Sequence, residues 1–371
     1  MKKLLTLLAG STLAFYMQGC SDNGTSANDD NPLSKGSVYV YTSDYKSQSG
    51  ELRWIDEDGK LSEKSLEFNQ DSKIVSANGK LFVLERFGAD NLALVDPEEN
   101  KTKWQKKLDA NANPSDVVKA NDNEVWVALD GAAKFIKVSV EDGEITKTVK
   151  TKDFCEGDAC TPNLVDFEVS GDTLFALFQR LANYTYVNKG LLAMYKLSNG
   201  ELLDTITLAK KNPNAMAFAK GKLYVASTGV YGNDYETYAS WTDADDARGI
   251  EVVDLSKKKS SMVVDGEKLG GGVTAFAVDS KNGIAYAAIY KDSKGNVPLV
   301  EVDLEKKSVK TIKGVSDVEG SLFFDEKSGV LYIGDRKSGE SAVYTYEDGE
   351  VTKIETATED VLPIYNITVV R

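Results

Sequence analysis

A short apolar–aromatic–apolar triplet recurs along the whole chain and organises its hydrophobic pattern. Its first copy is Val38–Tyr39–Val40, and most later copies follow another short apolar run and a turn rich in Gly, Asn or Lys. An apolar run, a tight turn and a second apolar run together predict a β-hairpin. The central aromatic residues of the copies are Tyr39, Phe82, Trp126, Phe175, Tyr224, Tyr286 and Tyr332.

Successive copies are 43 to 62 positions apart. A period of about 40–50 residues with several strands in each period is typical of β-propeller blades. The run Ile364–Val370 is left over after the last copy, whereas the first repeat lacks an innermost strand before Val38. Pairing the two completes the first blade and removes an exposed sheet edge. The pattern predicts an all-β fold, a seven-bladed β-propeller with four-stranded blades over residues 37–371, closed by the C-terminal strand.

The amino-acid composition and charge exclude several classes of partner and of catalytic site. The chain has 371 residues, a length that suits one propeller, and a formal net charge of −14. An acidic surface repels phosphate groups, so we expect no nucleic-acid partner and no binding of the folded domain to an anionic membrane. The chain has no His, which excludes Ser–His–Asp and Cys–His nucleophile pairs and His-ligated zinc or haem.

The N-terminus carries export signals. Residues 1–20 combine Lys2 and Lys3 with a following apolar stretch, which predicts a signal peptide. Its ending, MQGC, resembles a bacterial lipobox, which implies cleavage before Cys20, lipidation of that residue and, with Ser21 next, sorting to the outer membrane. An ordinary cleaved signal is the alternative. Residues 21–36 are poor in apolar side chains and predict a disordered tether.

Cys155 and Cys160 are the remaining cysteines. An even pair in one short segment of an exported protein predicts a local disulfide. A metal or redox role is disfavoured, because the chain lacks His and the pair is not spaced as CxxC.

Longer stretches point to a family. NPNAMAFAKGKLYVASTG followed by GIEVVDL, and NPSDVVKANDNEVWVALDG followed by FIKVSV, resemble the YVTN-type seven-bladed propellers of secreted and surface bacterial proteins. The resemblance covers about 37–371. It implies the fold but no single activity, because members bind many different ligands. The family's fourth-strand pattern is only loosely kept at Asn199–Leu202.

Three long loops are the first candidate binding region. Segments 153–163, 179–190 and 228–248 belong to the fourth and fifth blades and to the face around the channel mouth, so we expect them to cluster. Large aromatic residues beside carboxylates and amides suit a glycan or a protein partner. Packing of the loops on one another is the alternative. The aromatic candidates are Tyr184, Tyr186, Tyr231, Tyr235, Tyr238 and Trp241.

Polar residues at the channel mouth are the second candidate region. Arg86, Arg180 and Arg336 follow second strands, and Arg holds a carboxylate bidentately. Hydration of the channel is the alternative explanation for this ring. Counting from the starts of the inner strands places these residues at the mouth: Asp71, Asp116, Asp166, Asn214, Thr274, Glu319 and Asn366.

An acidic loop offers a third, weaker signal. Asp243, Asp245 and Asp246 supply the oxygen ligands that Ca²⁺ prefers. They lack the spacing, the Gly and the final Glu of an EF-hand. A solvated acidic loop therefore explains them better, and we expect no cofactor apart from this calcium alternative.

These observations leave three hypotheses. The first is a lipid-anchored, non-catalytic module of the bacterial envelope that presents the three loops to a protein or glycan. The second is a carboxylate-based hydrolase or lyase in the central channel, with or without Ca²⁺. The third is a scaffold subunit of an envelope complex that docks through the flat face of the disc.

Overall fold

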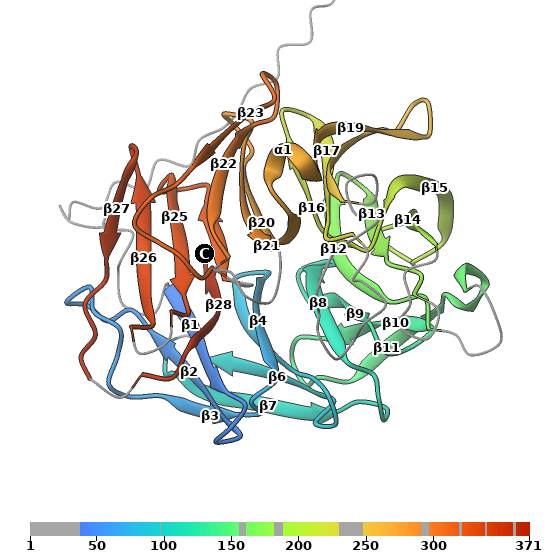
Figure 1. Ribbon diagram of the computed structural model, residues 1–371. Coiled ribbons are helices and arrows are strands. Elements are labelled where there is room, and N and C mark those ends of the chain that lie inside the picture. Colours follow the sequence, from blue (N-terminus) through green and yellow to red (C-terminus); the bar gives the residue numbers. More distant parts are fainter. Residues whose placement is uncertain are drawn as a thin grey trace, which may run out of the picture. The chain divides into compact units, whose positions relative to one another are not determined.

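The computed structural model describes residues 38–96, 98–155, 161–181, 188–229, 248–290, 297–318, 321–337, 340–358 and 361–371. The chain divides into two units, Met1–Asn31 and Pro32–Arg371, and every described residue belongs to the second. Within the described residues, 28 strands form seven four-stranded antiparallel sheets. Figure 1 shows these sheets side by side around a central axis, with β28, β4, β8, β12, β16 and β20 nearest to it. The predicted seven-bladed β-propeller is confirmed.

From the channel outward, blade 1 contains β28 (Ile364–Val369), β1 (Val38–Asp44), β2 (Ser49–Trp54) and β3 (Leu66–Phe68). In the same direction, blade 2 contains β4 (Ser72–Ala77), β5 (Lys80–Glu85), β6 (Asn91–Asp96) and β7 (Lys101–Lys107). Blade 3 contains β8 (Pro114–Lys119), β9 (Glu124–Leu129), β10 (Lys134–Ser139) and β11 (Ile145–Lys150). Blade 4 contains β12 (Leu164–Ser170), β13 (Thr173–Phe178), β14 (Lys189–Lys196) and β15 (Leu202–Lys211).

Blades 5 to 7 follow the same order. Blade 5 contains β16 (Pro213–Ala219), β17 (Lys222–Ser227), β18 (Gly249–Asp254) and β19 (Lys259–Asp265). Blade 6 contains β20 (Gly272–Asp279), β21 (Ile284–Tyr290), β22 (Leu299–Asp303) and β23 (Ser308–Thr311). Blade 7 contains β24 (Leu322–Asp325), β25 (Val330–Asp335), β26 (Ala342–Glu347) and β27 (Glu350–Lys353). Among the described residues, two short helices, η1 (Lys152–Phe154) and α1 (Gly266–Leu269), lie between blades. No helix of the described segments is long and apolar enough to cross a membrane.

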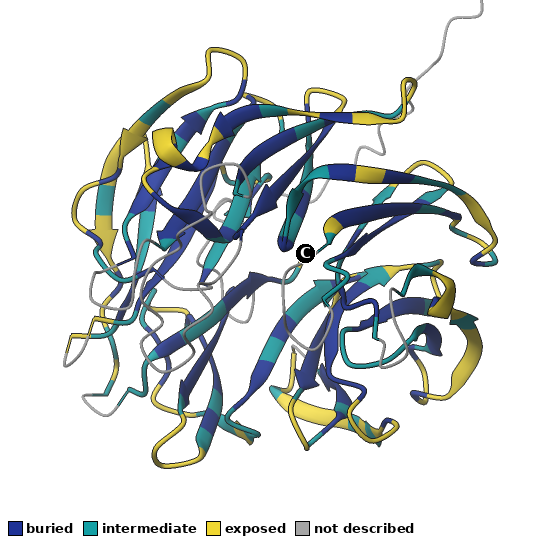
Figure 2. Ribbon diagram, turned by 45° about the vertical axis from the view of Figure 1, so that its right-hand side comes forward, coloured by how far each residue is buried: buried dark blue, intermediate teal, exposed yellow. Residues whose placement is uncertain are grey.

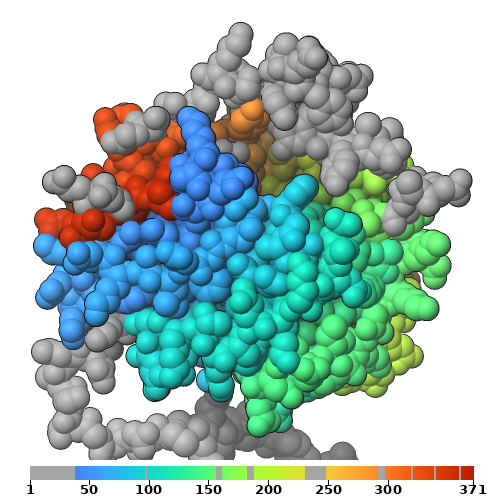
Figure 3. Space-filling model, turned by 90° about the horizontal axis from the view of Figure 1, so that it is seen from below, coloured from blue at the N-terminus to red at the C-terminus, as the bar shows by residue number. Residues whose placement is uncertain are grey.

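The two ends of the propeller meet in blade 1. β28 pairs with β1 in antiparallel register, with Val38 opposite Val369 and Val40 opposite Ile367. In Figure 3, red atoms from the end of the chain lie directly against the blue atoms of the first strands. The predicted closure by the C-terminal strand is therefore confirmed.

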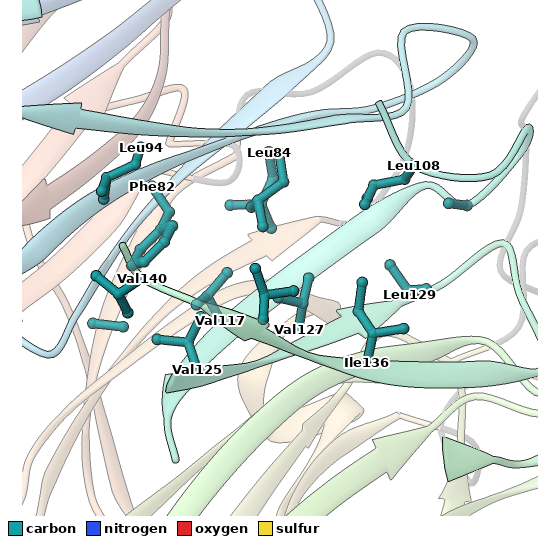
Figure 4. Close-up of a cluster of buried hydrophobic side chains, with 14 residues drawn as sticks. Phe82, Leu84, Leu94, Leu108, Val117, Val125, Val127, Leu129, Ile136 and Val140 are labelled. Atoms are coloured by element: carbon teal, nitrogen blue, oxygen red, sulfur yellow. The ribbon is translucent and has the colours of Figure 1, made fainter. Parts of the chain in front are cut away.

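The core lies between the blades. Among the described residues, buried apolar side chains form seven clusters, each between two neighbouring blades. Figure 4 shows the cluster in which Phe82 and Leu84 of blade 2 meet Val117, Val127 and Ile136 of blade 3. All seven repeated aromatic residues are buried. Truncating a buried aromatic side chain to Ala typically lowers the free energy of unfolding by about 3–5 kcal/mol. The aromatic residue therefore recurs in the sequence because each blade needs it for packing against its neighbour.

Exposure rises toward the outer strands. β7 and β11 are mostly exposed, and Figure 2 shows yellow mainly on such outer strands and on turns. The inner strands are largely buried or intermediate, so the residues that reach the channel are held on well-packed strands.

Candidate functional site

The mouth of the channel holds a cavity of about 430 Å³. All seven blades contribute to its walls, which are mainly polar. Three cationic side chains and one carboxylate lie among amides and hydroxyls. The described residues that line the cavity are Lys73, Arg86, Ser115, Asp130, Val165, Gln179, Leu181, Asn212, Asn214, Thr228, Thr274, Arg336, Tyr365 and Asn366.

Five β-bulges build much of this wall. In blade 3, Pro114 lies opposite Leu129 and Asp116 opposite Ala128, so Ser115 has no direct partner on the neighbouring strand. The same shift occurs on the innermost strands of blades 1, 4, 5 and 6. A bulge turns its extra side chain away from the regular alternation of the strand. The extra residues are Ser115, Val165, Asn214, Thr274 and Tyr365, and every one of them lines the cavity.

Three cationic side chains of the wall, Lys73, Arg86 and Arg336, are called the mouth cations. Lys73 on β4 donates from Nζ to the carbonyl oxygen of Ser115 at 3.0 Å. Arg86 follows β5 and donates from Nε to Oδ1 of Asn113 at 3.2 Å. Arg336 follows β25, and its guanidinium carbon lies 5.8 Å from the ring centre of Tyr365, within range of a cation–π contact.

Asp130 is the carboxylate of the cavity wall. It accepts hydrogen bonds from Nδ2 of Asn113 at 2.8 Å and Nδ2 of Asn163 at 3.1 Å. Burial raises the pKa of Asp130, and the positive charge of Arg86 opposes that rise. Asn113 therefore bridges the two groups, because its Oδ1 accepts from Arg86 while its Nδ2 donates to Asp130.

Three side chains, Asp116, Asp166 and Asn366, join the innermost strands to one another and are called the bridge residues. Oδ2 of Asp116 accepts the backbone N–H of Phe167 at 2.9 Å, and Oδ2 of Asp166 accepts that of Met216 at 2.7 Å. Oδ1 of Asn366 accepts the backbone N–H of Ile74 at 2.8 Å. Each contact links one blade to the next, which gives these side chains a structural role.

Burial raises the pKa of both aspartates among the bridge residues. For Asp166 the negative charge of Asp116 adds to the effect of burial, and the pKa lies well above its usual range. The positive charge of Lys73 lowers both pKa values but does not cancel the rise.

Glu168, also on β12, carries a strongly perturbed carboxyl group. Burial, and after it the charge of Asp116, raises its pKa to about 8. It lines a second cavity of about 400 Å³ whose walls come from β12, β16, β20 and β24 and include Glu326. Within the described segments, no group of three or more His, Cys, Asp or Glu side chains is placed to hold a metal ion.

The structure places the three predicted arginines differently. Arg86 and Arg336 line the mouth cavity. Arg180 does not, although its neighbours Gln179 and Leu181 do. Nε of Arg180 donates to the carbonyl oxygen of Phe154 at 3.2 Å. Arg180 therefore connects the bases of two predicted loops.

The described bases of the three loops come together, as predicted. The backbone N–H of Leu181 donates to Oδ1 of Asn163 at 3.3 Å. Gln179 donates from Nε2 to Oδ1 of Asn212 at 2.7 Å, and Nδ2 of Asn212 donates to the carbonyl oxygen of Gly229 at 3.0 Å. Segments 153–163, 179–190 and 228–248 thus leave the propeller at one side of the mouth.

Several predicted residues lie outside the described part of the chain, so their predictions stay open. Among them are Cys20 and Cys160, and with the latter the predicted disulfide to Cys155. The others are Tyr184, Tyr186, Tyr231, Tyr235, Tyr238, Trp241, Asp243, Asp245, Asp246 and Glu319.

Lys73 is the most important residue that sequence reasoning missed. The sequence placed Asp71 at this point of the ring, but Lys73 lies opposite Leu84 as Asp116 lies opposite Ala128. Counting from the aromatic triplets Leu81–Val83 and Val125–Val127 would have aligned the two. Asp71 is buried, with Oδ1 3.5 Å from the hydroxyl of Tyr365.

Comparison with known proteins yields one family and a set of similar folds. Residues 34–245 match the family described as outer membrane protein assembly factor BamB. No curated protein matches the chain. Hydrazine synthase of Kuenenia stuttgartiensis is similar with a TM-score of 0.60 and 13% identity over 91% of this chain and 99% of that chain. Dihydro-heme d1 dehydrogenase NirN in complex with DHE gives a TM-score of 0.53 and 11% identity over 92% and 76%. Similarity at this identity shows the fold alone.

Proposed function

Because the chain belongs to the family of outer membrane protein assembly factor BamB, we propose that it is a non-catalytic interaction module of the bacterial cell envelope. The propeller serves as a rigid frame, and the loops of blades 4 and 5 bind the partner. A protein partner fits the family best, and an envelope glycan is the alternative for the same aromatic loops.

The convergence of the three loop bases at one side of the mouth carries this proposal. Asn212 connects the loops after β13 and β17, because it accepts a hydrogen bond from Gln179 at 2.7 Å and donates one to the carbonyl oxygen of Gly229 at 3.0 Å. Phe87, which follows Arg86, is 69% exposed. Aromatic side chains at the centre of an interface often supply much of its binding energy, so Phe87 offers an anchor within the described residues.

The test compares capture of envelope proteins by the full-length chain and its variants. Phe87→Ala should reduce capture of the specific partner at least tenfold, and the combined change of Tyr235, Tyr238 and Trp241 to Ala should abolish it. Leu203→Ala is the matched control, because Leu203 is also exposed, at 54%, but lies on the outer strand β15. Equal loss in all three variants would overturn the assignment of the face.

Anchoring by lipid at Cys20 in the outer membrane completes the proposal. A chemically tagged fatty acid should label the chain in growing cells, and Cys20→Ser should remove the label and release the protein from the membrane fraction. Labelling that persists in Cys20→Ser would contradict this part of the proposal and leave the loop interface standing.

Glu168 favours a second candidate function, a carboxylate-based hydrolase or lyase. A carboxyl with a pKa of about 8 is protonated at neutral pH, as a general acid must be, and Asp116 is near enough to raise that pKa. Under this hypothesis, incubation of the protein with envelope glycans yields cleaved glycan products, and the Glu168→Gln variant yields none. A calcium chelator tests the metal-assisted form. Turnover that is absent, or unchanged in Glu168→Gln, excludes this candidate.

A further inference from the structure

We propose that the mouth cavity binds a small anionic sugar, that is, a molecule with one carboxylate or phosphate group and several hydroxyl groups. This site adjoins the partner-binding loops, because Gln179, Leu181 and Thr228 at their bases line it. Its charged groups instead lie on β4 and on the turns after β5, β9 and β25. The cavity volume of about 430 Å³ lies within the range of about 300–1,000 Å³ that is usual for small-molecule sites.

Charge supports the anionic part of the ligand. The protein as a whole is acidic, with a formal net charge of −14, yet the described part of the cavity wall carries three cations and one carboxylate. The carboxylate of Asp130 already accepts hydrogen bonds from the side-chain amides of Asn113 and Asn163. Neither Lys73 nor Arg86 forms an ion pair with a carboxylate among the described residues. A positive wall in an acidic protein attracts and holds an anion.

The arginines are already oriented. Asn113 accepts the Nε–H of Arg86 at 3.2 Å and is itself held by Asp130. Arg336 lies over Tyr365, with 5.8 Å between its guanidinium carbon and the ring centre. Side chains that are fixed before binding lose little freedom when a ligand arrives. The two guanidinium groups therefore suit a planar carboxylate or a phosphate.

A buried acceptor supports the hydroxyl groups of the ligand. Nδ2 of Asn214 donates to the carbonyl oxygen of Val273 at 2.7 Å, which fixes the orientation of the amide. Its Oδ1 is buried and has no hydrogen-bond partner among the described residues. A buried acceptor without a donor is costly. Asn214 also lines the cavity, so a ligand that donates hydrogen bonds fits this wall better than a bare anion without hydroxyl groups.

Calorimetric titration of the full-length protein tests this proposal. The probes are glucuronate for the carboxylate, glucose 6-phosphate for the phosphate, glucose as the neutral analogue and sulfate as the bare anion without hydroxyl groups. We expect one or both anionic sugars to bind at least tenfold more tightly than glucose and sulfate. The stronger of the two identifies the anionic group. No binding of either anionic sugar, or equal binding of glucose, would overturn the proposal.

Variants locate the site. Arg86→Gln and Arg336→Gln should each weaken the anionic sugar at least tenfold, and Arg86→Lys should retain part of the affinity. Lys147→Gln removes an exposed cation from the outer strand β11 and should change nothing. If Lys147→Gln weakens sugar binding as much as the arginine variants do, the sugar is held by general electrostatic attraction and not by a specific site. Phe87→Ala should leave sugar binding intact and Arg86→Gln should leave partner capture intact, so the two proposals fail separately.

Discussion

The mouth cations and the bridge residues lie around the same channel but have different partners. Asp116 and Asp166 accept backbone N–H groups of the next blade at 2.9 and 2.7 Å. Arg86 instead donates to a neighbouring side chain and borders a cavity. The hydrogen-bond partner, and not the residue type, separates groups that hold the ring together from groups available to a ligand. Lys73 and Asn366 belong to both sets. Lys73 donates to the backbone carbonyl oxygen of Ser115 in the next blade, Asn366 accepts the backbone N–H of Ile74, and both side chains line the cavity.

Removing β28 should have the largest effect on stability and on sugar binding, because it removes a bridge residue and part of the cavity wall at once. Ending the chain at Pro363 takes away the inner strand of blade 1, the bridge to Ile74 and the cavity residues Tyr365 and Asn366. We expect no cooperative thermal unfolding and no sugar binding. A sharp unfolding transition at the temperature of the intact protein would contradict the closure.

Asp116→Ala should come next, because it leaves the N–H of Phe167 without its acceptor inside the protein. The expected loss is about 1–3 kcal/mol in the free energy of unfolding, measured by urea titration at one fixed pH. Asp116→Asn keeps an oxygen acceptor and should lose clearly less. Equal losses would assign the effect to charge and not to the bridge.

Glu168 should make stability depend on pH. Its pKa rises from the reference value of 4.5 to about 8 in the folded protein. Between these values the folded state holds a proton that the unfolded state has lost, so the free energy of unfolding falls with rising pH, by up to about 1.4 kcal/mol per unit. This contribution is fully present below pH 4.5 and lost as pH rises through 8.

Comparison with Glu168→Gln isolates this effect from that of Asp116 and Asp166, whose raised pKa values act in the same direction. Urea unfolding at pH 5 to 9 should fall more steeply for the original protein than for the variant. Parallel curves would show that Glu168 is not held protonated.

Arg86→Gln should have the smallest effect on stability. Arg86 is half-buried and loses one side-chain hydrogen bond, to Asn113, so we expect a change below about 1.5 kcal/mol. Its loss of sugar affinity should nevertheless be at least tenfold. A large loss of stability would move Arg86 from the mouth cations to the residues that hold the ring together.

The fold could be predicted from the sequence because each blade packs against its neighbour in the same way. Tyr39, Phe82 and Trp126 are fully buried at equivalent positions, and a buried aromatic at a fixed spacing is visible in the sequence. The extra strand Ile364–Val369 was predictable for a similar reason, since the first repeat lacked one strand.

The candidate site was only partly predictable. Arg86 and Arg336 follow directly from the ends of β5 and β25. Lys73 was missed because bulges shift the count by one residue in blades 3 to 6 but not at Lys73 in blade 2. A bulge depends on how a strand pairs with its neighbour, and this pairing cannot be predicted from the residues of that strand alone.

The pairing of the first and last described strands in blade 1 also sets the order of assembly. During synthesis, β1 emerges first and β28 last, so the first blade stays incomplete until the final strand is available. Contacts between distant parts of a chain form slowly because a long loop must close. Tyr365 and Asn366 arrive with that strand, and the finished mouth therefore arises in the same late event that closes the ring.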